Sequence, residues 1–380
     1  MPVSSDVVVV GGGAIGLAIA WRAAAAGLGV TVVDPGLGTG ASWAAAGMLA
    51  PISEAAYGEE PLLLLSLEAA RRYPSFVAEL EAVTGTTVGY RTCGTLTVAA
   101  DSGDRAQLAE RHRHQVGLGL HVEWLGGRAC RGLEPLLAPA VQGGVLAEGD
   151  HQVETRLMVR ALGQAAEGSG AAIVRDTVDL VRLERGRVVG VTTAGGVAIG
   201  APQVVLCAGC WSGGVAGLPP EALPPVRPVK GQILRLRGPA DAPLLSRSLG
   251  ALVAGRFVYA VPRGDGRLVV GATSEEQGFD TTVRAGAVMD LLEDLAAVLP
   301  AARELELVEA RAALRPGSPD NAPILGPTSV PGLLVATGHH RHGILLTPVT
   351  ADAITTILTT GSVPEMMAPF LPARFVAAAP

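Results

Sequence analysis

Three glycines near the start of the chain have a spacing that suits a phosphate. Gly11, Gly13 and Gly16 form a Gly-x-Gly-x-x-Gly pattern directly after the apolar run at 7–10. In such a pattern the first glycine permits a tight turn, the second lets the backbone approach a diphosphate, and the third allows a helix to pack closely on a strand. Asp34 follows the next apolar run and is placed to accept a hydrogen bond from a ribose. These residues predict a dinucleotide site, against the alternative of a strand-to-helix turn that binds nothing. The loop alone does not distinguish FAD from NAD.

Two arginines and a tyrosine could bind a carboxylate. Arg315 is the first candidate, because a guanidinium offers two parallel donors to a carboxylate and keeps its charge. Arg341 and Tyr259 are second candidates. The alternatives are a surface arginine on the turn before Pro316 and a tyrosine that only packs in the core.

Two other clusters have residue types that can bind metals. His339, His340 and His342 have no carboxylate close to them in the sequence, so they do not predict a metal site. Cys207 and Cys210 form a single Cys-x-x-Cys pair at a strand end, which favours packing over zinc or redox chemistry.

The elements that must position these residues begin with a βαβ unit. The runs at 7–10 and 30–33 are typical of strands buried on both faces, and a helix is expected at 17–26, ended by Gly27. Parallel strands joined by a helix predict a doubly wound sheet. Further along we expect helices at 62–83 (despite Pro74), 156–166, 291–299 and 344–358, and strands at 95–98, 172–174, 187–193, 197–199, 204–206, 232–236, 257–261, 268–271 and 333–336.

The alternating strands after residue 94 belong in a different layer from the buried parallel ones. We therefore predict an α/β fold (α+β overall), in which a doubly wound Rossmann-type domain is interleaved with an antiparallel-sheet substrate domain. The predicted boundaries are 1–85, 145–220 and 310–380 for the nucleotide-binding domain, and 86–144 and 221–309 for the substrate domain.

Composition narrows the class of protein. With 49% hydrophobic and 17% charged residues, the 380-residue chain has ample material for two cores. A net charge of −6 argues against nucleic acid as a partner, and the one basic stretch, Arg105 to Arg113, is interpreted as a solvated helix face. No secretory signal or membrane span is expected, and four cysteines favour a reducing, cytoplasmic location.

Three segments carry a resemblance to a known family. Ser42 to Pro51, Val204 to Ser212 and Gly338 to Leu346 resemble the D-amino-acid oxidase family of flavoproteins, closest to the glycine oxidases of thiamine biosynthesis. The matches fall at both ends and in the middle, so the resemblance covers almost the whole chain. It implies FAD as the cofactor. The residues expected at FAD are Gly11, Gly13, Ala14, Ile15, Gly16, Asp34, Pro35, Ala41, Ser42, Ala46, Gly47, Met48, Val178, Ala208, Gly209, Trp211, Gly338, His339, His340, Arg341, His342, Gly343, Ile344 and Leu345.

The resemblance also implies an activity. It places Arg315 at the substrate carboxylate with Tyr259 as a further donor, and Arg341 nearby. Glycine would lose a hydride from its α-carbon to the flavin, giving glyoxylate, ammonia and hydrogen peroxide with oxygen as acceptor, and the imine or glyoxylate would feed thiamine thiazole synthesis. The start of the last helix would point at the pyrimidine edge of the flavin. A homo-oligomer, a tetramer in the family, is expected.

Two departures qualify this assignment. Some relatives carry a bulkier residue where this chain has Ser274, so larger substrates could enter. No cysteine lies between Arg315 and Ala322, where sarcosine-oxidase relatives attach FAD, so non-covalent FAD is expected. The alternatives are a D-amino-acid or sarcosine oxidase, a dehydrogenase that reduces a quinone, or a non-catalytic nucleotide-binding subunit of a dehydrogenase complex. The joint presence of Arg315, Tyr259 and Arg341 favours an enzyme.

Overall fold

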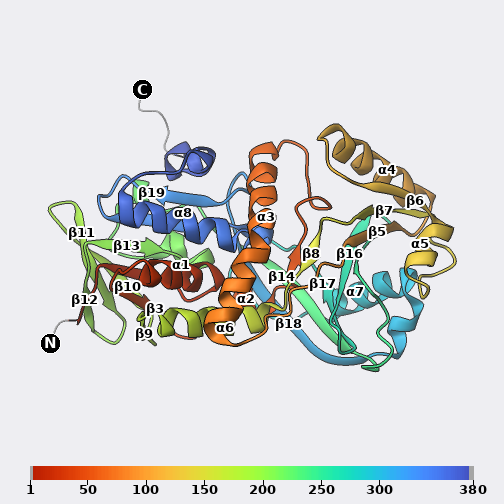
Figure 1. Cartoon of the computed structure of the whole chain (residues 1–380), viewed down its shortest axis with the longest axis horizontal. Coiled ribbons are helices and arrows are strands. Elements are labelled where there is room, and N and C mark those ends of the chain that lie inside the picture. Colours follow the sequence, from red (N-terminus) through yellow and green to blue (C-terminus); the bar gives the residue numbers. More distant parts are fainter. Residues whose placement is uncertain (1–2, 376–380) are drawn as a thin grey trace.

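A six-stranded sheet carries the glycine-rich loop in the first of two layered units (Figure 1). The computed structural model of the chain describes residues 3–375. The strand order is β19-β20-β13-β2-β3-β9, and all neighbours are parallel except β19 and β20. The strands are β2 (Val7–Val10), β3 (Val30–Val33), β9 (Ala172–Val174), β13 (Gln203–Leu206), β19 (Ile324–Pro327) and β20 (Leu333–Thr337). The predicted parallel sheet is confirmed.

Alternate valines of β2 face two different layers. Val7 and Val9 pack in a core with four helices: α1 (Ala14–Ala25), α3 (Glu60–Thr84), α6 (Thr155–Gly168) and α8 (Thr347–Thr360). Val8 and Val10 pack against a smaller sheet of order β1-β12-β11-β10. Its strands are β1 (Val3–Ser4), β10 (Val178–Glu184), β11 (Arg187–Thr193) and β12 (Ala198–Gly200). Because both faces of β2 are buried, its sequence is a continuous apolar run.

An eight-stranded sheet forms the second unit, on the right of Figure 1, in the order β18-β14-β17-β16-β15-β5-β7-β6. The strands are β5 (Thr95–Ala99), β6 (Glu123–Gly126), β7 (Gly143–Ala147), β14 (Arg227–Arg237), β15 (Ser248–Val253), β16 (Arg256–Pro262), β17 (Arg267–Gly271) and β18 (Glu306–Gly317). The helices that accompany it are α4 (Ser102–Gly117), α5 (Gly127–Leu133) and α7 (Ala285–Val298). Val258 and Ala260 of β16 pack in one core with α7, while Tyr259 and Val261 face a second cluster that includes Ala46. This alternation points one face of the sheet at the first unit.

The remaining elements are short. A two-stranded sheet joins β4 (Met48–Leu49) to β8 (His151–Gln152), and α2 covers Ala41–Ala44. The 3₁₀ helices are η1 (Gly209–Gly214), η2 (Pro220–Ala222), η3 (Pro300–Glu304), η4 (His340–His342), η5 (Glu365–Phe370) and η6 (Pro372–Phe375).

Several element limits differ from those predicted. Helix α1 begins at Ala14 rather than 17, directly after the loop. The last helix, α8, begins at Thr347 rather than 344, because residues 340–346 form a 3₁₀ helix and turns. Pro348 lies in the first turn of α8, where a residue without a backbone N–H loses no helical hydrogen bond. Strands β7 and β18 cross the predicted limits at 145 and 310, and both belong to the eight-stranded sheet.

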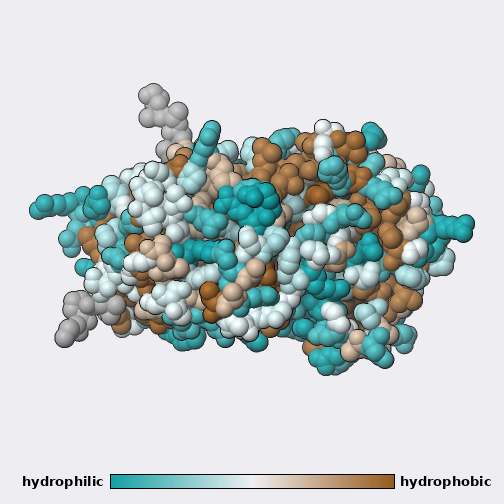
Figure 2. Space-filling model, in the orientation of Figure 1, coloured by the Kyte–Doolittle hydropathy of each residue, from teal (hydrophilic) through white to brown (hydrophobic). Residues whose placement is uncertain are grey.

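The visible surface is mixed in polarity. Figure 2 shows hydrophilic side chains over most of this face, with hydrophobic surface gathered above α3 and α4. Exposed large apolar side chains lie on both helices, for example Leu64 on α3 and Val116 on α4. Within residues 3–375, no helix has the length and hydrophobicity to span a bilayer.

Candidate active site

A cavity of about 1150 Å³ connects the glycine-rich loop of the first unit with the eight-stranded sheet of the second. Gly11, Gly13 and Asp34 line one part of it, and Tyr259 and Arg315 line another. The cavity therefore joins the predicted nucleotide site to the predicted carboxylate site, which lie some 300 positions apart in the sequence.

The glycine-rich loop has the close backbone contacts that its sequence predicts. Gly11 adopts a φ of +108°, and a Cβ there would collide with the carbonyl of Cys207. A Cβ at Gly16 would collide with the Gly11 carbonyl oxygen. Gly13 lines the cavity where α1 begins, so a diphosphate there would face the positive end of a helix. The loop thus fits a dinucleotide such as FAD.

Asp34 has a second role that the sequence analysis missed. Its carboxylate accepts hydrogen bonds from the backbone N–H groups of Gly12 and Gly36, both at 2.7 Å. It therefore ties the glycine-rich loop to the turn after β3. Since a carboxylate has about four lone-pair positions, it can still accept from a ribose.

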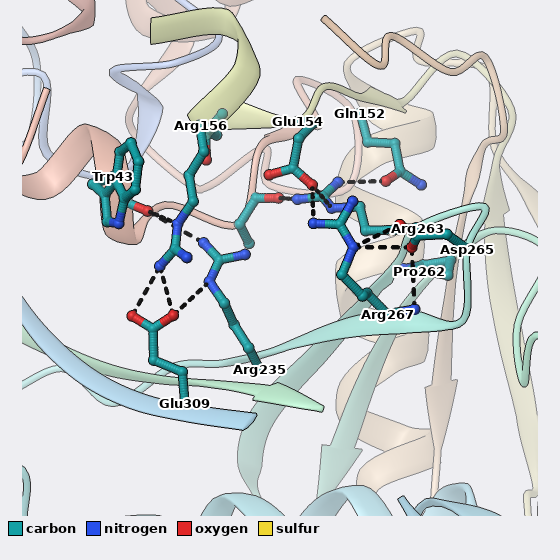
Figure 3. Close-up of polar contacts among 12 residues, drawn as sticks. Trp43, Gln152, Glu154, Arg156, Arg235, Pro262, Arg263, Asp265, Arg267 and Glu309 are labelled. Atoms are coloured by element: carbon teal, nitrogen blue, oxygen red, sulfur yellow. Dashed lines mark hydrogen bonds and ion pairs between the residues drawn. The ribbon is translucent and has the colours of Figure 1, made fainter. Parts of the chain in front are cut away.

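The segment from Trp43 to Gly47, which lines the cavity from Ala44 onward, is held by arginines from both units (Figure 3). The carbonyl of Trp43 accepts from Arg156 Nε of α6 and from Arg235 Nη2 of β14, each at 3.2 Å. The carbonyl of Ala46 accepts from Arg263 Nη2 at 2.5 Å. A backbone fixed at these points can line a flat cofactor closely without moving.

Each of these arginines has a carboxylate partner (Figure 3). Glu309 accepts from Arg156 with both oxygens at 2.8 Å and lies 3.6 Å from Arg235. Burial lowers the pKa of Arg235 to about 10, so it stays charged at neutral pH. Arg263 is only 5% exposed and lies 3.1 Å from the equally buried Glu154. No local pattern marks these residues, because their partners lie far away in the sequence.

Arg315 lies on β18 with its guanidinium over the neighbouring strand. Its Nη1 donates to the carbonyl of Thr273 at 3.1 Å. The guanidinium occupies the space above Gly231, where any Cβ would collide with it. In the described part of the chain no carboxylate lies within 4 Å of it, so most of its five N–H donors can bind a ligand in the cavity.

Tyr259 approaches the same place from β16. It pairs with Gly271 of β17, and its ring covers that glycine, where a Cβ would collide with the phenol. Burial raises the pKa of Tyr259, while Arg315 nearby lowers it. Because burial dominates, the hydroxyl keeps its proton and can donate to a carboxylate held by Arg315. The structure thus brings the two predicted residues together.

Arg341 is less available than Arg315. It lies 3.5 Å from Glu54 and 3.4 Å from Glu59, and its Nε donates to His342 Nε2 at 3.1 Å. Burial raises the pKa of Glu54, whereas Arg341 and Arg315 lower it. Arg341 lines the cavity, but its charge is already shared with two carboxylates.

The three histidines of the C-terminal loop are neutral at neutral pH. Burial lowers the pKa of His339 to about 3, of His340 to about 4 and of His342 to about 3. His339 Nε2 lies 3.1 Å from Thr350 Oγ1 of α8. His339 and His340, which line the cavity, can therefore contact a cofactor through neutral rings. Among the described residues, no three side chains of His, Cys, Asp or Glu are grouped so that they could hold a metal ion.

Most of the predicted cofactor residues line the cavity, and a few lie behind it. Those that line it are Gly11, Gly13, Ala14, Ile15, Asp34, Pro35, Ala41, Ser42, Ala46, Gly47, Met48, Val178, Ala208, Gly209, Trp211, His339, His340, Arg341, Gly343 and Ile344. Gly16, Gly338, His342 and Leu345 are not among the lining residues. Leu345 is instead buried in the core cluster that includes residues of α8. The contacts of all these residues with FAD stay predictions.

Burial keeps both thiols of the Cys-x-x-Cys pair protonated. Cys207 and Cys210 are both buried free thiols. Burial raises the pKa of Cys207 far above its usual range and that of Cys210 to about 12, so neither is a thiolate at neutral pH.

The sequence analysis also missed side chains at the substrate end. Arg111 of α4 lines the cavity, although the stretch at 105–113 was interpreted as a solvated face. Tyr57, Phe257 and Phe279 line it as well, and Ser274 lies there as predicted. The only available signal for Arg111 was a mixed charge pattern that surface helices share.

Similarity to known proteins extends over most of the chain. Residues 6–357 match the family described as FAD dependent oxidoreductase. The chain is 34% identical to glycine oxidase of Geobacillus kaustophilus, covering 98% of this chain and 97% of that protein. It is 36% identical to the bifunctional protein ThiO/ThiG of Nostoc sp. over 93% of this chain, but it spans only 52% of that protein, about half its length.

Two solved structures resemble the fold closely. The crystal structure of glycine oxidase from Geobacillus kaustophilus superposes with a TM-score of 0.89 at 34% identity, over 98% of this chain and 99% of the other. That of iminodiacetate oxidase from Chelativorans sp. superposes with a TM-score of 0.86 at 26% identity, over 96% and 98%.

Proposed function

Since the chain belongs to the family of FAD-dependent oxidoreductases, we propose that it oxidises the amine-bearing carbon of glycine, with oxygen as the electron acceptor. The observation that carries the proposal is the meeting of Arg315 and Tyr259 in the cavity that begins at the glycine-rich loop. Such a pair suits a small carboxylate-bearing substrate next to a dinucleotide cofactor. The relatives named glycine oxidase support glycine as the substrate.

The proposed reaction converts glycine, oxygen and water into glyoxylate, ammonia and hydrogen peroxide. When bound, FAD supplies the two-electron acceptor. Arg315 would hold the substrate carboxylate in a bidentate pair, and Tyr259 would donate to the same group. Fixing one end of a three-atom backbone orients its α-carbon, which is the main contribution required when no strong base takes part.

The alternatives of sarcosine and small D-amino acids remain within the proposal. Ser274 lines the cavity. Its small side chain would leave room for a substituent larger than hydrogen. One structural relative is named iminodiacetate oxidase, an enzyme named for an N-substituted glycine. A role in thiamine thiazole synthesis is supported by the ThiO/ThiG relatives, of which this chain matches about half.

Steady-state kinetics under air would test the proposal. Peroxide production should be measured with glycine, sarcosine and D-alanine on the FAD-loaded protein. We expect peroxide with glycine at a higher kcat/KM than with D-alanine. Turnover of D-alanine alone would replace glycine with a D-amino acid as the substrate. Turnover only with a quinone acceptor would identify a dehydrogenase.

A further inference from the structure

Arg111 is a charged side chain in the cavity that the proposed reaction of glycine does not use. It lies on α4 and lines the cavity, and within residues 3–375 no carboxylate lies within 4 Å of its guanidinium. Two nearby charged residues of the same helix, Glu110 and Arg113, instead pair with each other on its solvent side. An arginine that faces a cavity with no anion to meet it is an open binding group.

The helix directs Arg111 toward the cavity. Arg111 and His114 are three positions apart, so they share one face of α4, and both line the cavity. His114 stacks on Tyr57 with ring centroids 3.7 Å apart, which attaches that face to the segment before α3. Arg113 is exposed on another face of the helix.

The position of Arg111 relative to the carboxylate site follows from β16. Its guanidinium carbon lies 5.5 Å from the centre of the Phe257 ring. Phe257 and Tyr259 are two residues apart on one strand, so they project from the same face about 7 Å apart. Tyr259 lies beside Arg315, whereas the Phe257 ring leans the other way, over Gly250 of β15. Arg111 therefore marks a second cationic position, further along β16 and on the opposite side of it from Arg315. Two separate cationic positions in one cavity suit the two ends of a dicarboxylic molecule.

The charges around Arg111 favour an anion. Burial lowers its pKa, and the charge of Arg341 lowers it further. The carboxylates of Glu54 and Glu59 are already shared with Arg341. A substrate with one carboxylate would neutralise Arg315 alone and leave Arg111 partly desolvated without a partner, which is unfavourable.

Building on the proposed function, we propose that Arg111 binds a second carboxylate, so that the site takes amino acids with two acidic groups. The first carboxylate lies at Arg315, and the second extends from the amine nitrogen or from the α-carbon toward Arg111. The reaction is the same two-electron oxidation of the amine-bearing carbon with oxygen and water, and only the products change. Iminodiacetate would give glyoxylate, glycine and hydrogen peroxide, and D-aspartate would give oxaloacetate, ammonia and hydrogen peroxide.

Binding without turnover tests this directly. The FAD-loaded protein should be titrated with malonate, succinate and glutarate, and with acetate, propionate and butyrate, following the change in flavin absorption. We expect the best dianion to bind at least about tenfold more tightly than the monoanion that lacks its second carboxylate, which is acetate for malonate, propionate for succinate and butyrate for glutarate. In Arg111→Gln that ratio should fall by at least about tenfold, toward one, as for loss of a hydrogen bond to a charged group.

Arg113→Gln is the matched control, because it removes the same charge from the same helix outside the cavity. Its dianion-to-monoanion ratio should equal that of the unaltered protein. Arg111→Lys keeps the charge and should recover part of the ratio, which also guards against a folding defect in the glutamine variant. Equal binding of dianions and monoanions by the unaltered protein, or an equal change in both control and Arg111 variants, would overturn the proposal.

Turnover then locates the second carboxylate. The kcat/KM for iminodiacetate, which carries it on nitrogen, should be compared with those for D-aspartate and D-glutamate, which carry it on the α-carbon. A preference for either over glycine that disappears in Arg111→Gln supports the proposal. If dianions bind in an Arg111-dependent way but no amine is oxidised, the proposed reaction fails and the binding site stands. If glycine is oxidised but dianions bind no more tightly than monoanions, the proposed reaction stands and the second carboxylate site at Arg111 fails.

Discussion

Replacing Arg315 by alanine isolates the substrate carboxylate site from the rest of the molecule. Among residues 3–375, the guanidinium donates one hydrogen bond, to the carbonyl of Thr273, and it lies over Gly231 in the cavity. The substitution therefore removes one protein hydrogen bond and no core packing, and the FAD-facing loop is unaffected. We expect the FAD content and thermal stability to stay close to those of the unaltered protein.

The expected loss follows from the partner that is left behind. Removing one member of a buried ion pair costs about 3–5 kcal/mol, because the other charge stays desolvated. At about 1.4 kcal/mol for each factor of ten, kcat/KM for glycine should fall by about two to four orders of magnitude. Arg315→Lys should recover only part, since an ammonium lacks the planar pair of donors.

Gly231→Ala offers a second perturbation at the same place. The new methyl group would collide with the Arg315 guanidinium and displace it while keeping its charge. We expect kcat/KM for glycine to fall, by less than in Arg315→Ala. Gly264→Ala, at a turn with open space around it, is the control and should have normal activity. Steady-state kinetics with glycine and with an amine that lacks a carboxylate measures these effects. An Arg315→Ala protein that keeps most of its glycine activity, or loses glycine and the simple amine equally, would refute the carboxylate role.

Three further predictions concern the cofactor and the loops around it. Acid precipitation should release FAD into the supernatant, and flavin that stays with the protein would show a covalent link. Asp34→Ala should weaken FAD binding by about ten- to a hundredfold, because it removes a charged hydrogen-bond acceptor for the ribose. It should also lower the melting temperature, because Asp34 accepts two backbone hydrogen bonds. Unchanged FAD affinity in a titration would limit Asp34 to that structural role. Asp150 is buried and accepts from the N–H groups of Ile52 and Ser53, and burial raises its pKa to about 7. Because the native state then holds this proton more tightly than the unfolded chain, its contribution to the free energy of unfolding falls as pH rises from about 4 to 7, by up to about 4 kcal/mol. Thermal melts across this range should show a smaller downward slope in Asp150→Asn, and an identical slope would contradict the assignment.

Local patterns in the sequence were enough to predict the nucleotide-binding half of the site. The glycine-rich loop depends on residues within six positions of one another, and the continuous valines of β2 directly reflect burial on both faces. Residue type and resemblance agreed on Arg315 and Tyr259 as candidates for the carboxylate site, and both line the cavity. The fold class followed from the same local signals, and the likeness to glycine oxidase structures confirms it.

The features that were missed depend on distant partners. Arg263 donates to the carbonyl of Ala46, which lies 217 positions earlier, so neither residue has a recognisable neighbour pattern. Arg111 looks like any other charge on a surface helix until α4 is placed against the cavity. The start of α8 was misplaced because apolar residues at 344–346 suit either a helix or a buried turn. In each case tertiary packing decides what the local sequence leaves open.

The most direct test of the central claim is to mix the FAD-loaded protein with glycine in the absence of oxygen. If the chain transfers a hydride from glycine to its flavin, the visible absorption of oxidised FAD should disappear. Admitting oxygen should then restore it with one hydrogen peroxide formed per flavin, and glyoxylate and ammonia should appear in equal amounts. A flavin that stays oxidised in the presence of saturating glycine would contradict the account.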